Sequence, residues 1–312
     1  MTELLLPFDE VAEERSAAVA YLSARQLASR LRDNDPTDEQ VAAIEAPMEP
    51  LAVVAGAGSG KTQTMALRVL WLVANGLVPP HRVLGLTFTR KAAGELGLRV
   101  RTMLRRVLVA HEREPFLRDD VATALRTGEP RVSTYHSYAS ALIDEHALRL
   151  GLEPATQVIG EAMAWQLAWR VVEAYDGPLD TVDKAAATVV QYVLGLSGDL
   201  AEHLHTTADL SDHLARVCTR VDAAQSVLSR APTLAFAQMQ RARGELLPMV
   251  DAYAALKRER GVIDYSDQVA LAARLARDGD QVVAIEQARW GAVLLDEYQD
   301  TGESQRVLLT SL

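Results

Sequence analysis

The sequence has 312 residues, which is long enough for two domains or for one large domain that carries an insertion. Hydrophobic residues make up 49% and charged residues 24%, a balance that excludes the disordered and fibrous classes of protein. The net charge of −10 excludes a protein that coats nucleic acid with a generally basic surface, so any nucleic-acid contact has to be local.

Cysteine content and the N-terminus restrict the compartment. Cys218 is the only cysteine, which excludes an internal disulfide framework and a cysteine-based metal cluster. The first residues place a short apolar patch before acidic residues, which is not the order of a signal peptide. No stretch stays apolar for long enough to cross a bilayer. We therefore expect a cytoplasmic protein without a membrane partner.

Four short apolar runs rich in branched residues are typical of buried parallel strands. They are LAVV at 51–54, VLGLT at 83–87, RVST at 131–134 and AVLLD at 292–296. Helical patterns separate these runs along the chain. The alternation of strand and helix predicts an α/β fold with a parallel sheet.

A glycine-rich segment, AGAGSGKT at 55–62, lies between the first predicted strand and an amphipathic helix expected at 62–75. The glycines let backbone N–H groups approach phosphate oxygens at the helix N-terminus. Lys61 can supply a positive charge to the β- and γ-phosphates of ATP, and the Thr62 hydroxyl can reach Mg²⁺. A simple glycine-rich turn is the alternative interpretation. The predicted nucleotide-binding residues here are Ala55, Gly56, Ala57, Gly58, Ser59, Gly60, Lys61 and Thr62.

A second helical pattern begins at Lys91 and places apolar residues on one stripe. These are Ala92, Leu96, Val100, Met103 and Val107. Basic residues lie mostly outside the stripe, and the segment contains one acid, Glu95. They are Arg90, Lys91, Arg99, Arg101, Arg105 and Arg106. A local nucleic-acid contact and an ordinary solvated helix face are equally good interpretations of this charge.

The middle of the chain, 147–250, is rich in alanine and leucine at helical spacing, with breaks at Gly177-Pro178 and at 195–198. Because a strand-like run follows at 292–296, the simplest topology is a helical domain inserted into the α/β domain. Trp165 and Trp169 are four residues apart, and we expect them to be core contacts and not a base-stacking pair. His203, His205 and His213 are expected on solvated helix faces.

An acidic pair follows the last predicted strand, where Asp296 and Glu297 come directly after Val293, Leu294 and Leu295. At a strand end, Asp296 can hold Mg²⁺, and Glu297 can orient and deprotonate a water near the γ-phosphate. The pair alone is common and uninformative, but beside a phosphate loop it predicts a catalytic site.

Six motifs in this order resemble the UvrD, Rep and PcrA family of DNA helicases and the related RecB-type helicase–nuclease subunits. They are PTDEQ at 36–40, AGAGSGKT at 55–62, LTFTRKAAGEL at 86–96, STYHS at 133–137, IDYSD at 263–267 and LLDEYQDT at 294–301. The resemblance implies a RecA-like P-loop NTPase domain formed by 1–146 and 251–312, interrupted by a helical subdomain at 147–250.

The same resemblance implies roles for single residues. Gln40 would read the adenine through its amide, Gln299 would link the nucleotide site to DNA binding, and Asp264 matches an acidic position at the return from the helical region. Lys61, Glu297 and Gln299 are the catalytic candidates, and Thr62 and Asp296 the metal ligands. Two motifs would contact single-stranded DNA through Thr87, Phe88, Thr89, Arg90, Thr134, Tyr135, His136 and Ser137.

The sequence departs from the family pattern at a few positions. Ala55 stands where glycine is strict, Arg90 where asparagine is usual, Tyr135 where phenylalanine is common and Gly302 where asparagine often occurs. The arginine should strengthen contact with the DNA backbone and the tyrosine should keep stacking. His136 has no companion residues at metal-ligand spacing, so we expect it to be neither a metal ligand nor a catalytic base.

The resemblance implies the N-terminal part of an ATP-dependent helicase that acts on single-stranded DNA or a duplex–single-strand junction in DNA repair or recombination. The arginine finger would come from a second RecA-like domain, absent from these 312 residues, or from a partner chain. We therefore expect Mg-ATP to bind without DNA-stimulated turnover. The alternatives are a truncated module that binds nucleotide and DNA without hydrolysis, and the motor part of a helicase–nuclease subunit.

Overall fold

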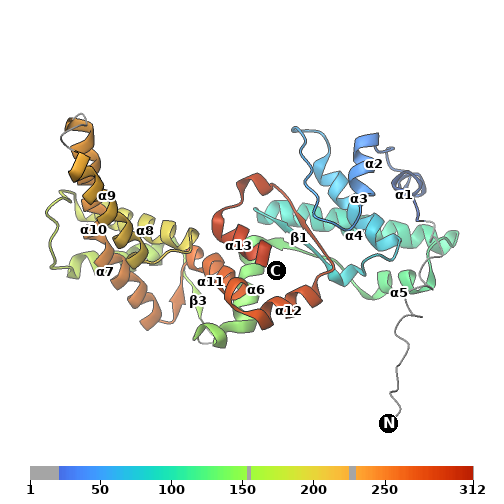
Figure 1. The fold of residues 1–312 in the computed structure, drawn as a ribbon. Coiled ribbons are helices and arrows are strands. Elements are labelled where there is room, and N and C mark those ends of the chain that lie inside the picture. The colour runs from blue at the N-terminus through green and yellow to red at the C-terminus, as the bar shows by residue number, and fades with distance from the viewer. Residues whose placement is uncertain (1–20, 153–155, 225–229, 312) are drawn as a thin grey trace, which may run out of the picture. The chain divides into compact units, whose positions relative to one another are not determined.

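The computed structural model describes residues 21–152, 156–224 and 230–311, shown as a ribbon in Figure 1. The described chain divides into two compact units. The first unit contains 21–85, Gly94–Arg131 and Gly291–Leu294, and the second contains Leu86–Ala93, Val132–Trp290 and 295–311. We describe each unit by itself.

The first unit contains α1 (Ala24–Leu31), α2 (Asp38–Ile44), α3 (Lys61–Ala74), η1 (Pro80–Arg82), most of α4 (Arg90–Arg113) and α5 (Asp119–Thr127). Helix α3 ends at Ala74 with Asn75 as its C-cap, and the next residue, Gly76, has a φ of 69°, a left-handed conformation suited to glycine. A Cβ at this position would lie 2.9 Å from Val121 Cγ2, so the close packing of α5 also requires glycine here. The helix predicted at 62–75 is thus confirmed to within one residue at each end.

The second unit contains most of the remaining elements. They are α6 (Tyr135–His146), η2 (Ala147–Leu150), β3 (Gln157–Val158), α7 (Glu161–Ala174), α8 (Ala186–Glu202), α9 (Thr207–Ala224), α10 (Arg230–Glu259), β4 (Val262–Ile263), α11 (Tyr265–Asp278), α12 (Asp280–Arg289), η3 (Tyr298–Asp300) and α13 (Glu303–Ser311). Strands β3 and β4 pair in parallel at the two ends of the α7–α10 segment.

The main sheet has the strand order β2-β1-β5, formed by Arg131–Thr134, Val83–Thr87 and Ala292–Leu295. Gly291 N–H bonds the Arg82 carbonyl, and Asp296 N–H bonds the Leu86 carbonyl. Residue numbers rise together along β1 and β5, so these two strands are parallel. The α/β fold with a parallel sheet is confirmed, and so are the strands predicted at 83–87, 131–134 and 292–296.

The strand predicted at 51–54 is absent, because these residues lie outside any strand and Val54 is 97% exposed. A run of branched residues forms a strand only beside a neighbouring strand, and within the described chain no strand pairs with this run. Strand β1, in contrast, is buried at every position between two partners. The apolar pattern alone did not distinguish these two situations.

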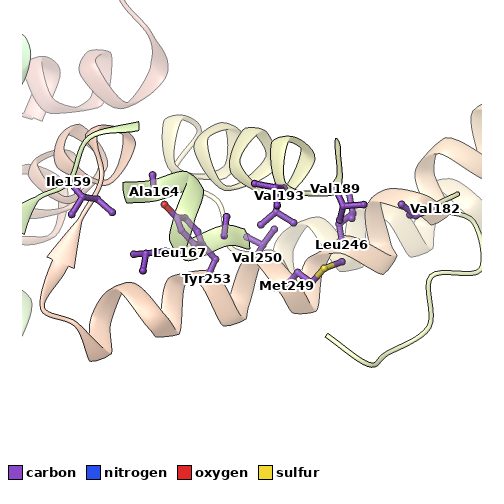
Figure 2. Packing of buried hydrophobic residues seen from close by; sticks show 12 residues of the cluster. Ile159, Ala164, Leu167, Val182, Val189, Val193, Leu246, Met249, Val250 and Tyr253 are labelled. Carbon is purple, nitrogen blue, oxygen red and sulfur yellow. The ribbon is translucent and has the colours of Figure 1, made fainter. Parts of the chain in front are cut away.

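Helices α7, α8 and α10 pack around a hydrophobic cluster of their own (Figure 2). Its side chains include Val189 and Val193 from α8 and Met249, Val250 and Tyr253 from α10. The described part of 147–250 is mainly helical, as expected, but it is not all-helical, because β3 (Gln157–Val158) lies in it and pairs with β4. Two helix boundaries also differ from the prediction. Helix α8 runs unbroken through 195–198 because tertiary packing overrides the low helix propensity of its two glycines, and α10 continues past residue 250 to Glu259.

The two tryptophans of α7 differ from each other. Their rings stack at a centroid distance of 5.1 Å and an interplanar angle of 21°. Trp169 packs against the hydrophobic cluster as expected, but Trp165 is 38% exposed. The prediction of a core position is therefore wrong for Trp165. A spacing of four residues places two side chains on the same side of a helix, but it does not show that both are buried. His203, His205 and His213 are exposed, as predicted.

Candidate nucleotide and DNA site

The phosphate loop lies directly before α3 in the first unit. Gly58 and Gly60 have φ angles of 76° and 82°, a left-handed region that favours glycine. Gly60 is also the N-cap of α3, whose first residue is Lys61. The first N–H groups of α3 therefore stand at the end of the loop without intrahelical partners, which is the arrangement that binds anions.

Lys61 folds back over this loop. Its ammonium donates to the carbonyls of Ala55 and Gly56 at 2.9 and 3.1 Å, and Ser59 Oγ donates to the same Gly56 carbonyl at 2.8 Å. An ammonium has three donors, so one N–H remains for a phosphate oxygen. The loop thus holds the lysine charge beside the backbone groups that can bind phosphate.

Gln40 contacts the loop from α2. Its side chain completes a capping box with Thr37, accepting from Thr37 N–H at 3.1 Å. Its Nε2 donates to the Ser59 carbonyl at 3.0 Å. The amide therefore braces the phosphate loop, with one lone pair and one N–H left for a base. The motif suggested only a contact with adenine and not this bracing.

Some of the basic residues of α4 contact other helices of the first unit. The apolar stripe faces inward, with Leu96, Val100, Met103 and Val107 buried, as predicted. Arg106 bonds Asp33 at 2.9 Å and also the Leu31 carbonyl, so it joins α4 to the end of α1. Arg99 donates to the Gln63 side chain at 3.3 Å in the first turn of α3. Part of the basic run is thus structural.

The acidic loop, Asp296–Gln299, follows β5 and lies in the second unit. Asp296 is half-buried, and its backbone bond to Leu86 holds it at the carboxyl end of β1. Its Oδ1 accepts from Glu297 N–H at 3.1 Å. Ligands of parallel sheets bind at this end of the strands, which suits a metal-binding carboxylate.

Glu297 has a left-handed backbone, with φ 54° and ψ 41°. This conformation is uncommon for a residue other than glycine, asparagine or aspartate, and such local strain concentrates at functional sites. The exposed Glu297 carboxylate accepts a hydrogen bond from Gln299 Nε2, so two catalytic candidates contact each other.

The DNA-contact candidates around β1 and β2 divide into exposed and buried groups. Phe88 and Tyr135 contact each other at a centroid distance of 4.9 Å, but Tyr135 is 1% exposed and Phe88 half-buried. Burial raises the pKa of the Tyr135 phenol, and Asp296 and Tyr298 contribute in the same direction. The buried Tyr135 ring therefore packs against Phe88, close to Asp296 and Tyr298.

The threonine hydroxyls of the same motifs form hydrogen bonds with nearby backbone groups. Thr87 is buried and donates to the Thr89 carbonyl at 3.1 Å, while Thr89 Oγ1 accepts from Ala92 N–H. Thr134 is the buried N-cap of α6 and accepts from Ser137 N–H. The candidates that remain accessible are Phe88, Thr89, Arg90, His136 and Ser137.

His136 is half-buried and meets the Tyr265 ring edge-on at 6.2 Å. Burial lowers the pKa of its imidazole, and the nearby Glu202 carboxylate acts against this shift. Among the residues that the structure describes, no group of three or more acidic, histidine or cysteine side chains is arranged to hold a metal ion.

The IDYSD motif forms a buried charge network at the return from α10. Lys257 is 4% exposed and donates to Asp264 Oδ2 and Asp267 Oδ2, each at 2.6 Å. Tyr253 donates to the same Asp264 oxygen at 3.1 Å. The other Asp264 oxygen caps α11 by accepting from the N–H groups of Ser266 and Asp267. Asp264 thus joins the end of α10 to the beginning of α11.

Residues 36–312 match the family described as the UvrD/REP helicase N-terminal domain. The chain belongs to this family. The match covers the phosphate loop, both groups of DNA-contact candidates and the acidic loop. It includes α7 to α10, so the helical segment is also part of the matched region.

Individual relatives are similar over much of the chain. An ATP-dependent DNA helicase UvrD2 of Mycobacterium tuberculosis (strain ATCC 25618 / H37Rv) is 32% identical over 87% of this chain and 34% of its own length. An ATP-dependent DNA helicase PcrA of Leuconostoc citreum is 25% identical over 89% of this chain and 31% of its own. A subunit of the ATP-dependent helicase/nuclease of Heliobacterium modesticaldum is 36% identical over 42% of this chain and 9% of its own. The chain thus spans about a third of the helicases' length.

The sequence reasoning missed the contacts that surround the motifs. Lys257 was not singled out, although a lysine seven residues before an aspartate at a helix start was the available signal. Glu202 was also missed, and its carboxylate lies against Gly302 after the acidic loop. No local pattern points to Glu202, because it is distant in sequence from the residues it contacts. In the described part of the chain, no helix is long and apolar enough to span a membrane.

Proposed function

We propose that this chain is the ATP-binding part of an ATP-dependent DNA helicase that translocates on single-stranded DNA. The main support for this proposal is the loop before α3. There, two glycines with left-handed backbone conformations and the folded-back Lys61 form a cradle for phosphate at a helix N-terminus. The relatives, which are named as ATP-dependent DNA helicases, support the same activity.

In this proposal ATP binds residues 55–62 with Mg²⁺ as its partner ion. Thr62 and Asp296 would hold the metal, Glu297 would activate water and Gln299 would link the nucleotide site to DNA binding, and these assignments rest on the motifs. Gln40 uses its spare lone pair and N–H to read adenine. An arginine from a second RecA-like domain or a partner chain completes the transition state. The helical insertion within a RecA-like domain, ending at β4 and not at residue 250, belongs to the same proposal.

A test of the metal assignment is Asp296→Asn. We expect the gain in ATP affinity on adding Mg²⁺ to fall by at least about tenfold, because losing even an outer-shell partner of a metal costs ten- to a hundredfold. Titration calorimetry with ATP, in Mg²⁺ and in chelator, measures this gain. Asp300→Asn, which alters a nearby exposed acid, is the matched control. Retention of the full gain in Asp296→Asn would remove Asp296 from the metal site.

For the DNA contact we propose the accessible residues of both motifs, with Phe88 as the stacking side chain and Arg90 as the phosphate contact. Phe88→Ala should weaken the binding of a single-stranded oligonucleotide by about 1–3 kcal/mol, the value of one base–aromatic stack. Tyr135→Phe is the control, because the buried ring is kept and only its hydroxyl is lost. Fluorescence anisotropy at one fixed salt concentration measures both. Equal affinity of Phe88→Ala and the parent chain would contradict the stacking assignment.

One observation favours the second candidate, the motor part of a helicase–nuclease. The similarity to the Heliobacterium modesticaldum helicase/nuclease reaches 36% identity, although it covers only 130 residues. Both candidates use the same nucleotide site. The third interpretation is a module that binds nucleotide and DNA without hydrolysis, and phosphate release by the parent chain that is lost in Glu297→Gln would contradict it.

A further inference from the structure

The C-terminal end of α8, at Glu202 and the turn after it, has features that are unfavourable for a helix end. A carboxylate at the C-terminal end of a helix opposes the helix dipole, and the last turn of α8 contains no basic residue. The helix then stops in a tight turn, with Leu204 at φ 57° and His205 N–H bonded to the Leu200 carbonyl. Leu204 thus occupies the position after a helix C-terminus where glycine is usual. Local stability alone would favour other residues here.

The Glu202 side chain reaches the chain segment after the acidic loop. Ser304 Oγ, in the buried first turn of α13, donates to Glu202 Oε2 at 3.0 Å. The other oxygen, Oε1, is buried and has no hydrogen-bond partner among the described residues. An unpaired buried carboxylate oxygen is costly, so a separate constraint holds the side chain in this place.

Gly302 explains how the carboxylate fits. A Cβ at residue 302 would collide with Glu202 Oε1 and lie 2.7 Å from Glu202 Cδ. Glycine at this position therefore makes room for Glu202, and the departure from asparagine in the sequence has a structural counterpart. Residue 302 follows Thr301, whose side chain lies beside Tyr135. The contact thus joins α8 to the end of the acidic loop.

Two more contacts place α8 at the same location. A Cβ at Gly198 would lie 3.4 Å from Ser266 Oγ, so α8 also lies close to the beginning of α11. The Glu202 charge acts on His136, one of the accessible DNA-contact candidates. Glu202 is therefore near both the acidic loop and a DNA-contact motif, although it comes from the helical segment between them in sequence.

We propose that Glu202 is a positioning residue through which helices α7 to α10 hold the segment Thr301–Ser304 and, through it, the acidic loop Asp296–Gln299. Its consequence for catalysis rests on the proposed function, but the contact itself does not. A movement of α8 would pull on Ser304 and on the backbone at Gly302, and the acidic loop directly before them would respond.

The first test is hydrogen–deuterium exchange of the full chain, which needs neither nucleotide nor DNA. In Glu202→Ala, peptides covering 296–304 should exchange about tenfold faster or more, the factor expected when a charge-assisted hydrogen bond is lost. Peptides of α3 should not change. Glu202→Gln, which keeps an acceptor for Ser304, should restore slow exchange. Unchanged exchange at 296–304 in Glu202→Ala would overturn the proposal.

The second test is a double-mutant cycle with Gly302→Ala, read by the same exchange and by Mg-ATP affinity. The added Cβ should speed exchange at 296–304 in the parent, and it should have little further effect in Glu202→Ala, where the obstructing carboxylate is gone. Equal effects of Gly302→Ala in both backgrounds would overturn the proposal. If Gly302→Ala alone does not fold, recovery of folding in the double variant supports it and failure to recover contradicts it.

Failure of this inference and failure of the proposed function give different results. If the parent chain binds no Mg-ATP, the function is wrong, while the exchange results still decide the role of Glu202. If Mg-ATP binds but exchange at 296–304 is indifferent to Glu202, only the positioning role is wrong. Ser304→Ala should reproduce the faster exchange of Glu202→Ala, and its failure to do so would remove the hydrogen bond from the explanation.

Discussion

Lys257→Ala should destabilise the chain by about 3–5 kcal/mol, because it leaves the carboxylates of Asp264 and Asp267 partly buried without their cation. The ammonium lies 2.6 Å from both carboxylates and is 4% exposed. Screening by water is therefore weak at the lysine, in contrast to the surface ion pairs of the chain. Urea unfolding followed by circular dichroism measures the loss.

Two further variants make this result specific. Lys184→Ala removes an exposed lysine and should change the stability by no more than about 0.5 kcal/mol. Lys257→Met combined with Asp264→Asn and Asp267→Asn should recover most of the loss, because replacing a whole buried charge group is often close to neutral. Asparagine also keeps the cap of α11. If Lys257→Ala unfolds at the same urea concentration as the parent, the buried network does not hold α10 to α11.

Lys61→Ala should weaken the binding of Mg-ATP about ten- to a hundredfold. The variant loses a charge-assisted contact with the phosphates that is worth about 1.5–3 kcal/mol. The lysine already lies over the loop through its bonds to Ala55 and Gly56, so little rearrangement is needed to reach a phosphate. Unfolding curves should be nearly unchanged, because these contacts are exposed. Equilibrium binding of a fluorescent ATP analogue measures the change.

Lys184→Ala again provides the control, since it removes one positive charge at an exposed position. A nonspecific electrostatic effect would lower the affinity equally in both variants and would decrease with added salt. A selective loss in Lys61→Ala identifies the loop as the binding site. Equal affinities of Lys61→Ala and the parent would mean that ATP does not bind at residues 55–62.

The sequence predicted the fold where pattern and packing agree. Strand β1 is buried at every position, and its unbroken apolar run was enough to place it. The apolar stripe of α4 was equally informative, because four of its five residues are buried in the structure. The run at 51–54 has the same composition as a buried strand and forms none. Propensity describes a residue's fitness for a sheet and not the presence of a neighbouring strand.

The motifs predicted candidate site residues, but they did not predict the contacts that these residues make within the chain. Motif order identified Gln40, Tyr135 and Asp264, but the structure shows each making contacts within the chain: Gln40 braces the phosphate loop, Tyr135 packs against Phe88, and Asp264 caps α11. For Gln40 and Tyr135 these tasks depend on partners that are distant in sequence. The sequence did not show which side chains are buried, because an aromatic residue in a motif can face either the solvent or the core.

Under the proposed function, the acidic loop 296–299 that would serve the nucleotide site lies beside the segments that would contact single-stranded DNA. Tyr135 supports Phe88 and lies beside Asp296 and Thr301, all within the second unit. Two ligands whose sites share such contacts should alter each other's affinity, with coupling free energies typically of about 1–3 kcal/mol.

The most direct measurement is the affinity of the chain for a fluorescent single-stranded oligonucleotide, with and without a saturating non-hydrolysable Mg-ATP analogue. The account predicts that the analogue changes the dissociation constant by about fivefold or more, and that Lys61→Ala removes this change. Identical dissociation constants with and without the analogue, in a parent chain shown to bind both ligands, would contradict the account.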